Sequence, residues 1–206
     1  LAPGDAQRPE TSCRPFALDR SGLVLGEGAG ALVLEDMEHA NNRGARIVAE
    51  VAGYGLSNDA VHLSRPEASG QIRAMRAALA DAAKHGIAPA DVAYINAHGT
   101  ATTLGDKTET EAIKAVFGDA AANIPISSTK ALHAHMMGAA GAVEFIAAIM
   151  AMNQATAPPT AHLWKPDPEC DLDYVPLEPR ALRRPQAVMS NSFAFGGVNA
   201  VLIARH

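Results

Sequence analysis

Three short segments of the chain collect side chains that could carry out chemistry, and the first of them follows a predicted strand. It runs from Asn96 to Asp106 and presents one imidazole, that of His98, beside the hydroxyls of Thr100 and Thr102. The ends of strands are where α/β folds build their sites. Hydroxyl-rich loops also cap the helices that follow them, so this segment alone leaves open whether His98 is structural or catalytic.

The second segment, Ser127 to His135, brings Lys130 and two more imidazoles, those of His133 and His135, to another strand end, just before a small-residue run. An imidazole near a helix N-terminus tends to stay neutral, because the positive end of the helix dipole disfavours its cation. A neutral ring can donate its Nε2–H to a developing oxyanion. Three histidines could instead bind zinc, but no carboxylate or cysteine lies at ligand spacing, and we predict no metal site.

The third segment, Asn191 to Asn199, places two aromatic rings, Phe193 and Phe195, one residue apart and just before two glycines. This pattern fits a hinge with an aromatic lid. It fits a packed β-bulge equally well. Both interpretations remain open at this point.

Glu144 lies in a segment, Gly141–Asn153, in which almost every other residue is apolar. A carboxylate buried there would cost on the order of several kcal/mol unless it is paired, hydrogen-bonded or protonated. Lys130 is the candidate partner.

Elements of regular structure must position these segments. Apolar runs and alternation predict strands at Leu23–Leu25, Ala29–Leu34, Ile47–Gly55, Ala93–Asn96, Ile124–Ser127, Asp171–Tyr174, Ala187–Ser190 and Ala200–Ala204. Helical spacing predicts a short turn at Glu38–Arg43 and helices at Gly70–His85, Asp106–Phe117 and Gly141–Asn153. Strands that alternate with helices indicate a layered α/β domain.

Composition excludes several classes of function. The net charge of −5 offers no basic stripe for nucleic acid. No run approaches the roughly 20 apolar residues that a membrane-spanning helix needs. Cys13 and Cys170 lie far apart in no metal-ligand pattern, which favours free thiols in a reducing compartment, the cytoplasm. Because the chain starts at Leu1 in polar coil, we expect it to belong to a longer polypeptide.

The three segments, in this order and at these separations, resemble the β-ketoacyl-ACP synthases of the Cys-His-His branch of the thiolase superfamily. The resemblance extends from about Cys13 to the end of the chain. It rests on the glycine-rich Gly22–Gly30, the turns Leu104–Lys107 and Ser128–Lys130, and the Asn-Ser-Phe-x-Phe-Gly-Gly ending. It implies that residues 1–206 form a thiolase-like half-domain, the C-terminal half. The implied fold is a mixed five-stranded sheet with helices on both faces, part of a layered αβαβα architecture.

The resemblance also implies roles for single residues. His98 and His135 match the two active-site histidines, which bind the malonyl thioester carbonyl and stabilise the enolate formed when carbon dioxide leaves. Lys130 matches the lysine that helps to order them. Glu144 matches a buried glutamate associated with a water or a monovalent cation. Asp106 would support this site.

Further matches concern the substrate. Thr100 and Thr102 match the hydroxyls that hold the pantetheine arm of the acyl carrier protein, and Phe195, with Phe193 next to it, matches a gating phenylalanine. The implied reaction is the decarboxylative Claisen condensation of malonyl-ACP with an acyl-enzyme thioester, in fatty-acid or related polyketide elongation. The implied partners are acyl carrier protein, an N-terminal half and a second copy in a homodimer, with no cofactor beyond the carrier's phosphopantetheine.

The nucleophilic cysteine of the family belongs to the N-terminal half, at the start of a helix that lowers its pKa. Neither Cys13 nor Cys170 has such a context. We therefore predict that this segment alone does not catalyse condensation.

Departures from the family pattern are expected to mark a specialised branch, such as the nodulation-type or long-chain synthases. They are His133-Ala134-His135 in place of the commoner Thr-Gly-His, Ala194 for Gly and Val198 for Thr. Alternate positions on a strand face opposite ways, so we expect His133 to point away from His135.

Two other functions remain as alternatives. A non-catalytic chain-length partner of the polyketide type tends to lose the catalytic histidines, whereas both are present here. An initiating synthase that uses coenzyme A would carry Asn where His135 stands. Asn96 and Lys107, where modular polyketide synthases usually have Glu and Pro, favour a free-standing enzyme.

Overall fold

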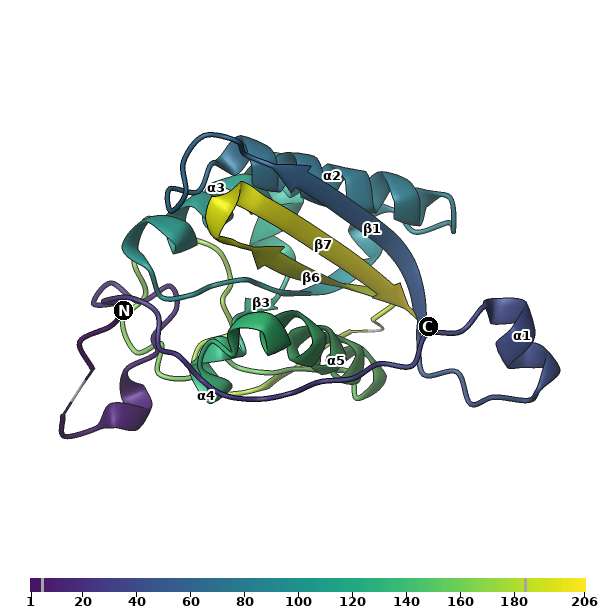
Figure 1. Cartoon of the computed structure of the whole chain (residues 1–206), viewed down its shortest axis with the longest axis horizontal. Coiled ribbons are helices and arrows are strands. Elements are labelled where there is room, and N and C mark those ends of the chain that lie inside the picture. Colours follow the sequence, from purple (N-terminus) through teal and green to yellow (C-terminus); the bar gives the residue numbers. More distant parts are fainter. Residues whose placement is uncertain (5, 184) are drawn as a thin grey trace.

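A five-stranded mixed sheet forms the centre of the molecule (Figure 1). The computed structural model describes residues 1–4, 6–183 and 185–206. The strands, in the spatial order β1-β7-β6-β2-β3, are β1 (Glu50–Asn58), β7 (Val198–Arg205), β6 (Ala187–Phe193), β2 (Val92–Asn96) and β3 (Ile126–Ser127). β7 is antiparallel to both of its neighbours, whereas β2 is parallel to β6 and β3. The predicted five-stranded mixed sheet is confirmed.

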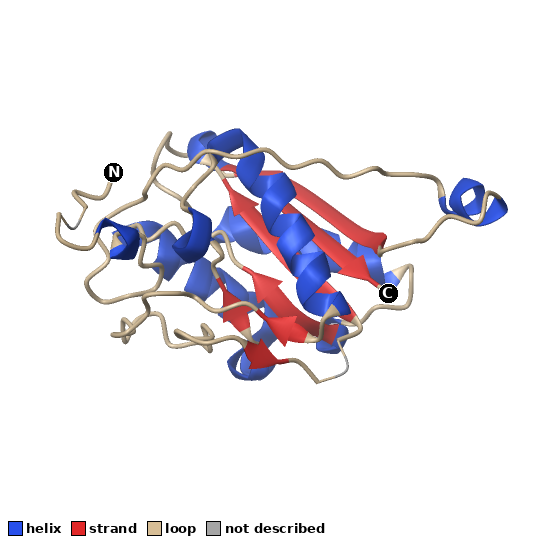
Figure 2. Ribbon diagram, turned by 90° about the horizontal axis from the view of Figure 1, so that it is seen from below, coloured by secondary structure: helices blue, strands red, loops and turns tan. Residues whose placement is uncertain are grey.

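Helices cover both faces of this sheet, as expected (Figure 2). On one face lie α2 (Ala68–Ala83), which contacts β1 and β7, and α3 (Thr103–Phe117), which packs against α2. On the other face α5 (Ala140–Asn153) contacts β6 and β2. Each face has its own cluster of buried apolar side chains.

The helices bury the sides that their spacing predicts. In α2 the inward positions are Gly70, Gln71, Ala74, Met75, Ala78, Leu79 and Ala82, which recur every three or four residues. The small residues among them let α2 lie directly on β1. α5 is apolar around most of its circumference, yet Met150 is half exposed.

The strands predicted at Leu23–Leu25 and Ala29–Leu34 are wrong. These residues are extended coil, and their only bridge pairs Leu25 with His135. The coil leads out to α1 (Met37–Asn42), which projects from the body of the molecule (Figure 1). Val33, for example, is 88% exposed. A strand needs a neighbour along its whole length to satisfy its backbone. Residues 23–26 make only isolated backbone hydrogen bonds, to Ala2 and His135, within the described part of the chain.

The strand predicted at Asp171–Tyr174 is also wrong, because this segment is coil. Two short strands that were not predicted, β4 (Thr156–Ala157) and β5 (Arg180–Ala181), pair beside it. The turn that carries His133 is helical, α4 (Lys130–His133), rather than extended. The remaining elements are 3₁₀ turns at Pro9–Thr11, Pro89–Asp91, Gly118–Asn123, Met137–Ala139 and Phe195–Gly197.

No helix among the described residues combines the length and the apolar character needed to cross a membrane.

Candidate active site

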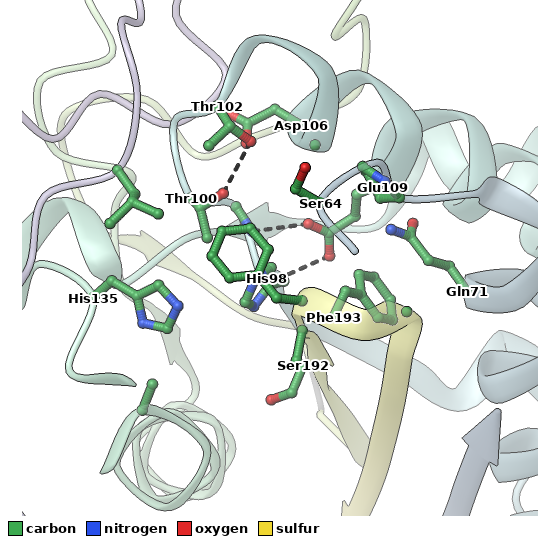
Figure 3. A pocket seen from close by; sticks show the side chains of 18 of the residues that line it. Ser64, Gln71, His98, Thr100, Thr102, Asp106, Glu109, His135, Ser192 and Phe193 are labelled. Atoms are coloured by element: carbon green, nitrogen blue, oxygen red, sulfur yellow. Dashed lines mark hydrogen bonds between the residues drawn. The ribbon is translucent and has the colours of Figure 1, made fainter. Parts of the chain in front are cut away.

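A cavity of about 530 Å³ opens where β2 and β3 end, and it collects most of the predicted site residues (Figure 3). Its lining includes His98, Thr100, Thr102, Asp106, His135, Glu144, Phe193 and Phe195. Lys130 lies directly behind the lining residue His98, because its ammonium donates a hydrogen bond to the backbone carbonyl of His98. Side chains from four separate segments of the chain thus meet in one place.

His98 and His135 face each other across this cavity. Their ring centroids are 5.5 Å apart and the ring planes are nearly perpendicular, at 85°. His98 lies two residues beyond the end of β2, and His135 lies two residues beyond α4, the helical turn that follows β3. The parallel pairing of β2 with β3 brings these two loops to the same edge of the sheet.

Both imidazoles are held neutral. Burial, and then the nearby charge of Lys130, lowers the pKa of His135 to about 4. The same two causes, with a contribution from His135, place the pKa of His98 well below its usual range. The prediction of neutral rings agrees with the direction of these shifts, whose largest causes are burial and the charge of Lys130.

The tautomer of His135 follows from its backbone contact. The backbone N–H of Met137 donates to Nδ1 of His135 at 3.1 Å. Since Nδ1 accepts this hydrogen bond, the single proton of the neutral ring resides on Nε2. The ring therefore offers an Nε2–H donor to a group in the cavity.

Lys130 and Glu144 form the buried pair that the sequence predicted. Nζ of Lys130 lies 2.5 Å from Oε1 of Glu144, and both side chains are almost fully buried. Apart from this ion pair, the carboxylate of Glu144 receives no well-directed hydrogen bond within the described part of the chain. Burial raises the pKa of Glu144, and the charge of Lys130 partly offsets that rise.

Glu109 is a residue of this site that the sequence interpretation missed. From the buried side of α3 its carboxylate accepts the backbone N–H groups of His98 at 2.9 Å and Gly99 at 2.8 Å. It also accepts the side-chain amide of Asn191, at 3.1 Å. Burial raises the pKa of Glu109. A charged residue on the inward side of a predicted helix, three residues after Asp106, is the signal that could have found it.

Thr100 and Thr102 line the cavity with their hydroxyls 3.1 Å apart. The loop between them turns through Ala101, whose φ is +62°. Asp106 anchors this loop to the N-terminal segment, because the backbone N–H of Phe16 donates to its carboxylate at 2.7 Å. Burial raises the pKa of Asp106 to about 7.

The two phenylalanines play different structural parts. Phe193 is buried, with its ring centroid 6.1 Å from that of His98. Phe195 is 64% exposed at the mouth of the cavity. After it comes Gly196, whose φ of +80° is readily accessible only to glycine, and whose N–H donates to the carbonyl of Leu63. Phe193 is packed within the regular pairing of β6 with β7, which has no bulge at this residue, whereas Phe195 lies beyond the last paired residue of β6.

The matches to known proteins identify the family. Residues 48–164 match the model of the β-ketoacyl synthase C-terminal domain. The chain belongs to the β-ketoacyl synthase family.

Two curated relatives in this family cover nearly the whole chain. Nodulation protein E of Rhizobium meliloti is 56% identical over 197 residues, which cover 96% of this chain and 48% of that protein. The 3-oxoacyl-[acyl-carrier-protein] synthase 2 of Staphylococcus aureus strain COL is 51% identical over 196 residues, with 94% and 46% covered. The chain thus spans about half the length of the curated relatives it matches.

A solved structure shares the fold as well. A type II polyketide ketosynthase, solved in complex with its acyl carrier protein and bound to a hexaketide, superposes with a TM-score of 0.93 and 38% identity. The match covers all of this chain and 50% of that one. The sheet and helices described above are therefore those of the C-terminal half of a ketosynthase.

The two cysteines of this chain do not have the properties of a nucleophile. Both are buried free thiols, and neither lines the cavity. Burial raises the pKa of Cys13 to about 12 and that of Cys170 to about 11. These thiols stay protonated at neutral pH and are poor nucleophiles.

His133 lies outside the cavity lining. Its ring bonds within its own segment, through Nδ1 to the carbonyl of Ala134 and through Nε2 to the hydroxyl of Thr129. The expectation for His133 assumed a strand, but the residue lies in the helical turn α4. Among the described residues no group of three His, Cys, Asp or Glu side chains could hold a metal ion.

Proposed function

We propose that this chain provides the decarboxylation site and the pantetheine-binding wall of a β-ketoacyl-ACP synthase. The reaction is the decarboxylative condensation of malonyl-ACP with an acyl-enzyme thioester, in fatty-acid or related polyketide elongation. The observation that carries the proposal is the pair of neutral imidazoles, His98 and His135, which lie 5.5 Å apart across one cavity.

The two rings would act on the malonyl thioester carbonyl. In the decarboxylation step the bond between the malonyl α-carbon and its carboxylate breaks, carbon dioxide leaves, and the electron pair passes to the thioester oxygen as an enolate. The Nε2–H of His135, and the ring of His98 opposite, can donate hydrogen bonds to this oxygen as its negative charge grows. Preorganised donors of this kind stabilise the transition state more than the ground state.

The condensation step needs a group that this chain does not supply. The enolate carbon would attack the carbonyl of an acyl thioester, a C–C bond would form, and a cysteine thiolate would leave. Because Cys13 and Cys170 are buried and protonated, we propose that the thiolate comes from an N-terminal half and that this segment alone forms no ketoacyl product.

Acyl carrier protein is the proposed partner that delivers the malonyl group. The hydroxyls of Thr100 and Thr102 would bind its pantetheine arm and so position the thioester at the two histidines. Support comes from the similarity to a ketosynthase that was solved with its acyl carrier protein. Phe195, exposed at the mouth, would gate entry, and Phe193 would pack beside the reacting atoms.

A decarboxylation assay tests the proposal. In a protein that joins this chain to the N-terminal half, malonyl-ACP should release carbon dioxide and yield 3-oxoacyl-ACP. His98→Ala or His135→Ala should each lower decarboxylation by about 10²–10³-fold, the usual cost of losing an oxyanion donor. His39→Ala is the matched control, because His39 is exposed on the projecting α1, and this variant should behave as the parent protein. Equal rates for all three variants would contradict the proposal.

A non-catalytic chain-length partner is the second candidate. Such a partner would show no decarboxylation with the N-terminal half present, and would raise product length only when mixed with an active ketosynthase. Retention of His98 and His135 in a shared cavity favours the catalytic assignment over this one.

Three remaining expectations follow the family resemblance. We propose a homodimeric cytoplasmic enzyme, and sedimentation of the joined protein would report its oligomeric state. A monovalent cation near Glu144 stays part of the proposal, since this carboxylate has no hydrogen-bond partner among the described residues apart from its ion pair with Lys130. No step is assigned to a cation.

A further inference from the structure

Gln71 breaks the pattern of the helix that carries it. The other inward positions of α2 are glycine, alanine, methionine or leucine, but its first turn buries a carboxamide. Gln71 is only 1% exposed. A buried polar residue on an otherwise apolar helix face, with no partner to compensate for it, tends to occur at a functional site.

The oxygen of this carboxamide has no partner. Oε1 of Gln71 is buried, and no described residue donates a hydrogen bond to it. A buried acceptor left without a donor costs free energy, so native proteins supply one from the protein, from ordered water or from a ligand.

Gln71 lines the cavity of His98 and His135, and its side chain points toward Glu109 and the cavity interior (Figure 3). Its oxygen Oε1 cannot be paired by Glu109, since that carboxylate, when ionised, only accepts hydrogen bonds. Nearby Phe193 offers an apolar ring. The cavity that Gln71 lines is a place from which a donor can reach this oxygen.

We propose that Gln71 forms a hydrogen-bonding subsite that takes an amide N–H of the pantetheine arm. This inference rests on the proposed function, in which a thioester on phosphopantetheine enters the cavity. The arm carries two amide N–H groups, which are neutral donors that match an amide oxygen without adding charge beside Glu109. Thr100 and Thr102 would hold the arm on one wall of the cavity and Gln71 on another, so that a misaligned thioester would be rejected.

Binding of pantetheine to the protein that joins this chain to the N-terminal half, which is the parent chain of this experiment, tests this proposal. Two analogues are compared with pantetheine, in which one amide N–H or the other is replaced by an ester oxygen. Gln71→Met keeps the length of the side chain and removes its hydrogen-bonding group. We expect this variant to bind pantetheine about five-fold more weakly, the effect of one neutral hydrogen bond. One ester analogue should bind the parent chain more weakly by a similar factor but bind Gln71→Met no worse than pantetheine itself.

Gln154→Met is the matched control, because Gln154 is an exposed residue at the end of α5 and lies outside the cavity lining. It should bind all three probes as the parent chain does. Thermal unfolding shows whether the variants are folded. Gln71→Met should be at least as stable as the parent, since it removes an unpaired buried acceptor.

The possible results separate two failures. If the parent chain binds pantetheine and Gln71→Met binds it equally well, or if both ester analogues lose the same affinity in the variant as in the parent, the Gln71 subsite is wrong while the proposed function stands. If the parent chain itself does not bind pantetheine, the proposed function fails and the subsite fails with it. A water molecule as the only partner of Gln71 would appear as equal binding of every probe by both proteins.

Discussion

Lys130 reaches His98 through the backbone and not through the imidazole, since its ammonium donates to the carbonyl oxygen of His98 at 2.6 Å. The same ammonium is paired with Glu144 on its other side. One buried cation thus fixes the loop that carries His98 and also disfavours protonation of its ring. The position of the ring and its charge state depend on the same side chain.

Lys130→Met should therefore destabilise the fold and raise the pKa of His98. Removing the cation leaves Glu144 as an uncompensated buried carboxylate, which costs about 3–5 kcal/mol in comparable pairs. Urea unfolding measures the first effect, and histidine NMR titration the second. The double variant Lys130→Met with Glu144→Gln should recover part of the loss. Lys84→Met is the control, because that lysine pairs with Asp81 on the exposed surface and its loss should leave the unfolding midpoint unchanged.

Glu109→Gln should loosen the same loop from the opposite side. The carboxylate accepts two adjacent backbone N–H groups, and an amide has only one oxygen with which to replace it. We expect a loss of about 1–3 kcal/mol in the free energy of unfolding, the cost of an unpaired buried donor. Glu111→Gln, on the exposed side of the same helix, should show no such loss. Equal effects at the two positions would mean that the loop does not depend on this carboxylate.

The tautomer of His135 is directly measurable. Nitrogen-15 NMR at neutral pH should show Nδ1 of His135 as the unprotonated nitrogen and Nε2 as the protonated one, because the Met137 N–H occupies Nδ1. The opposite assignment would remove His135 as a donor toward the cavity through Nε2.

The pH dependence of stability should separate Asp106 from His135, because their pKa values are shifted in opposite senses. Burial raises the folded-state pKa of Asp106 to about 7, so its contribution to stability is lost as the pH rises from about 4 to 7. The folded-state pKa of His135 is lowered from 6.5 to about 4, so its contribution is lost as the pH falls through that window.

Asp106→Asn should accordingly make stability fall more steeply between pH 7 and pH 4, whereas His135→Gln should make it fall less steeply. Urea midpoints at pH 7, 5.5 and 4 give the slope of stability against pH for the parent protein and for each of the two variants. A change of slope in the same direction for both variants would show that one of the two shifts has the wrong sign.

Much of this site was predictable from the order of the segments. His98 and His135 follow strands that a parallel sheet places side by side, and Lys130 was the nearest cation that could neutralise Glu144. The role of Glu109 could not be predicted in the same way, because it depends on hydrogen bonds to the backbone of a loop that folds onto this carboxylate. Hydrogen bonds between distant segments leave no periodic signal in the sequence.

The errors in the predicted secondary structure have a related cause. The apolar stretches Leu23–Leu25 and Ala29–Leu34 have the composition of strands, but a strand also needs a paired neighbour, which local sequence does not report. His133 was placed on a strand because it follows β3 closely, although the chain turns into α4 within three residues. Local propensity decides neither case.

The close contact between α2 and β1 supports a last prediction, at Gly55. A Cβ atom placed there would lie 2.6 Å from the backbone nitrogen of Ala78 and would also clash with the carbonyl oxygen of Ala74. Both obstacles are helix backbone, which cannot move aside as a flexible side chain can. Gly55→Ala should therefore lower the free energy of unfolding by about 1–3 kcal/mol or more, as overpacking does. Gly138→Ala is the matched control, because a Cβ atom there meets nothing within 4 Å. If the two variants had the same urea midpoint, the helix would have to lie farther from β1 than it does here.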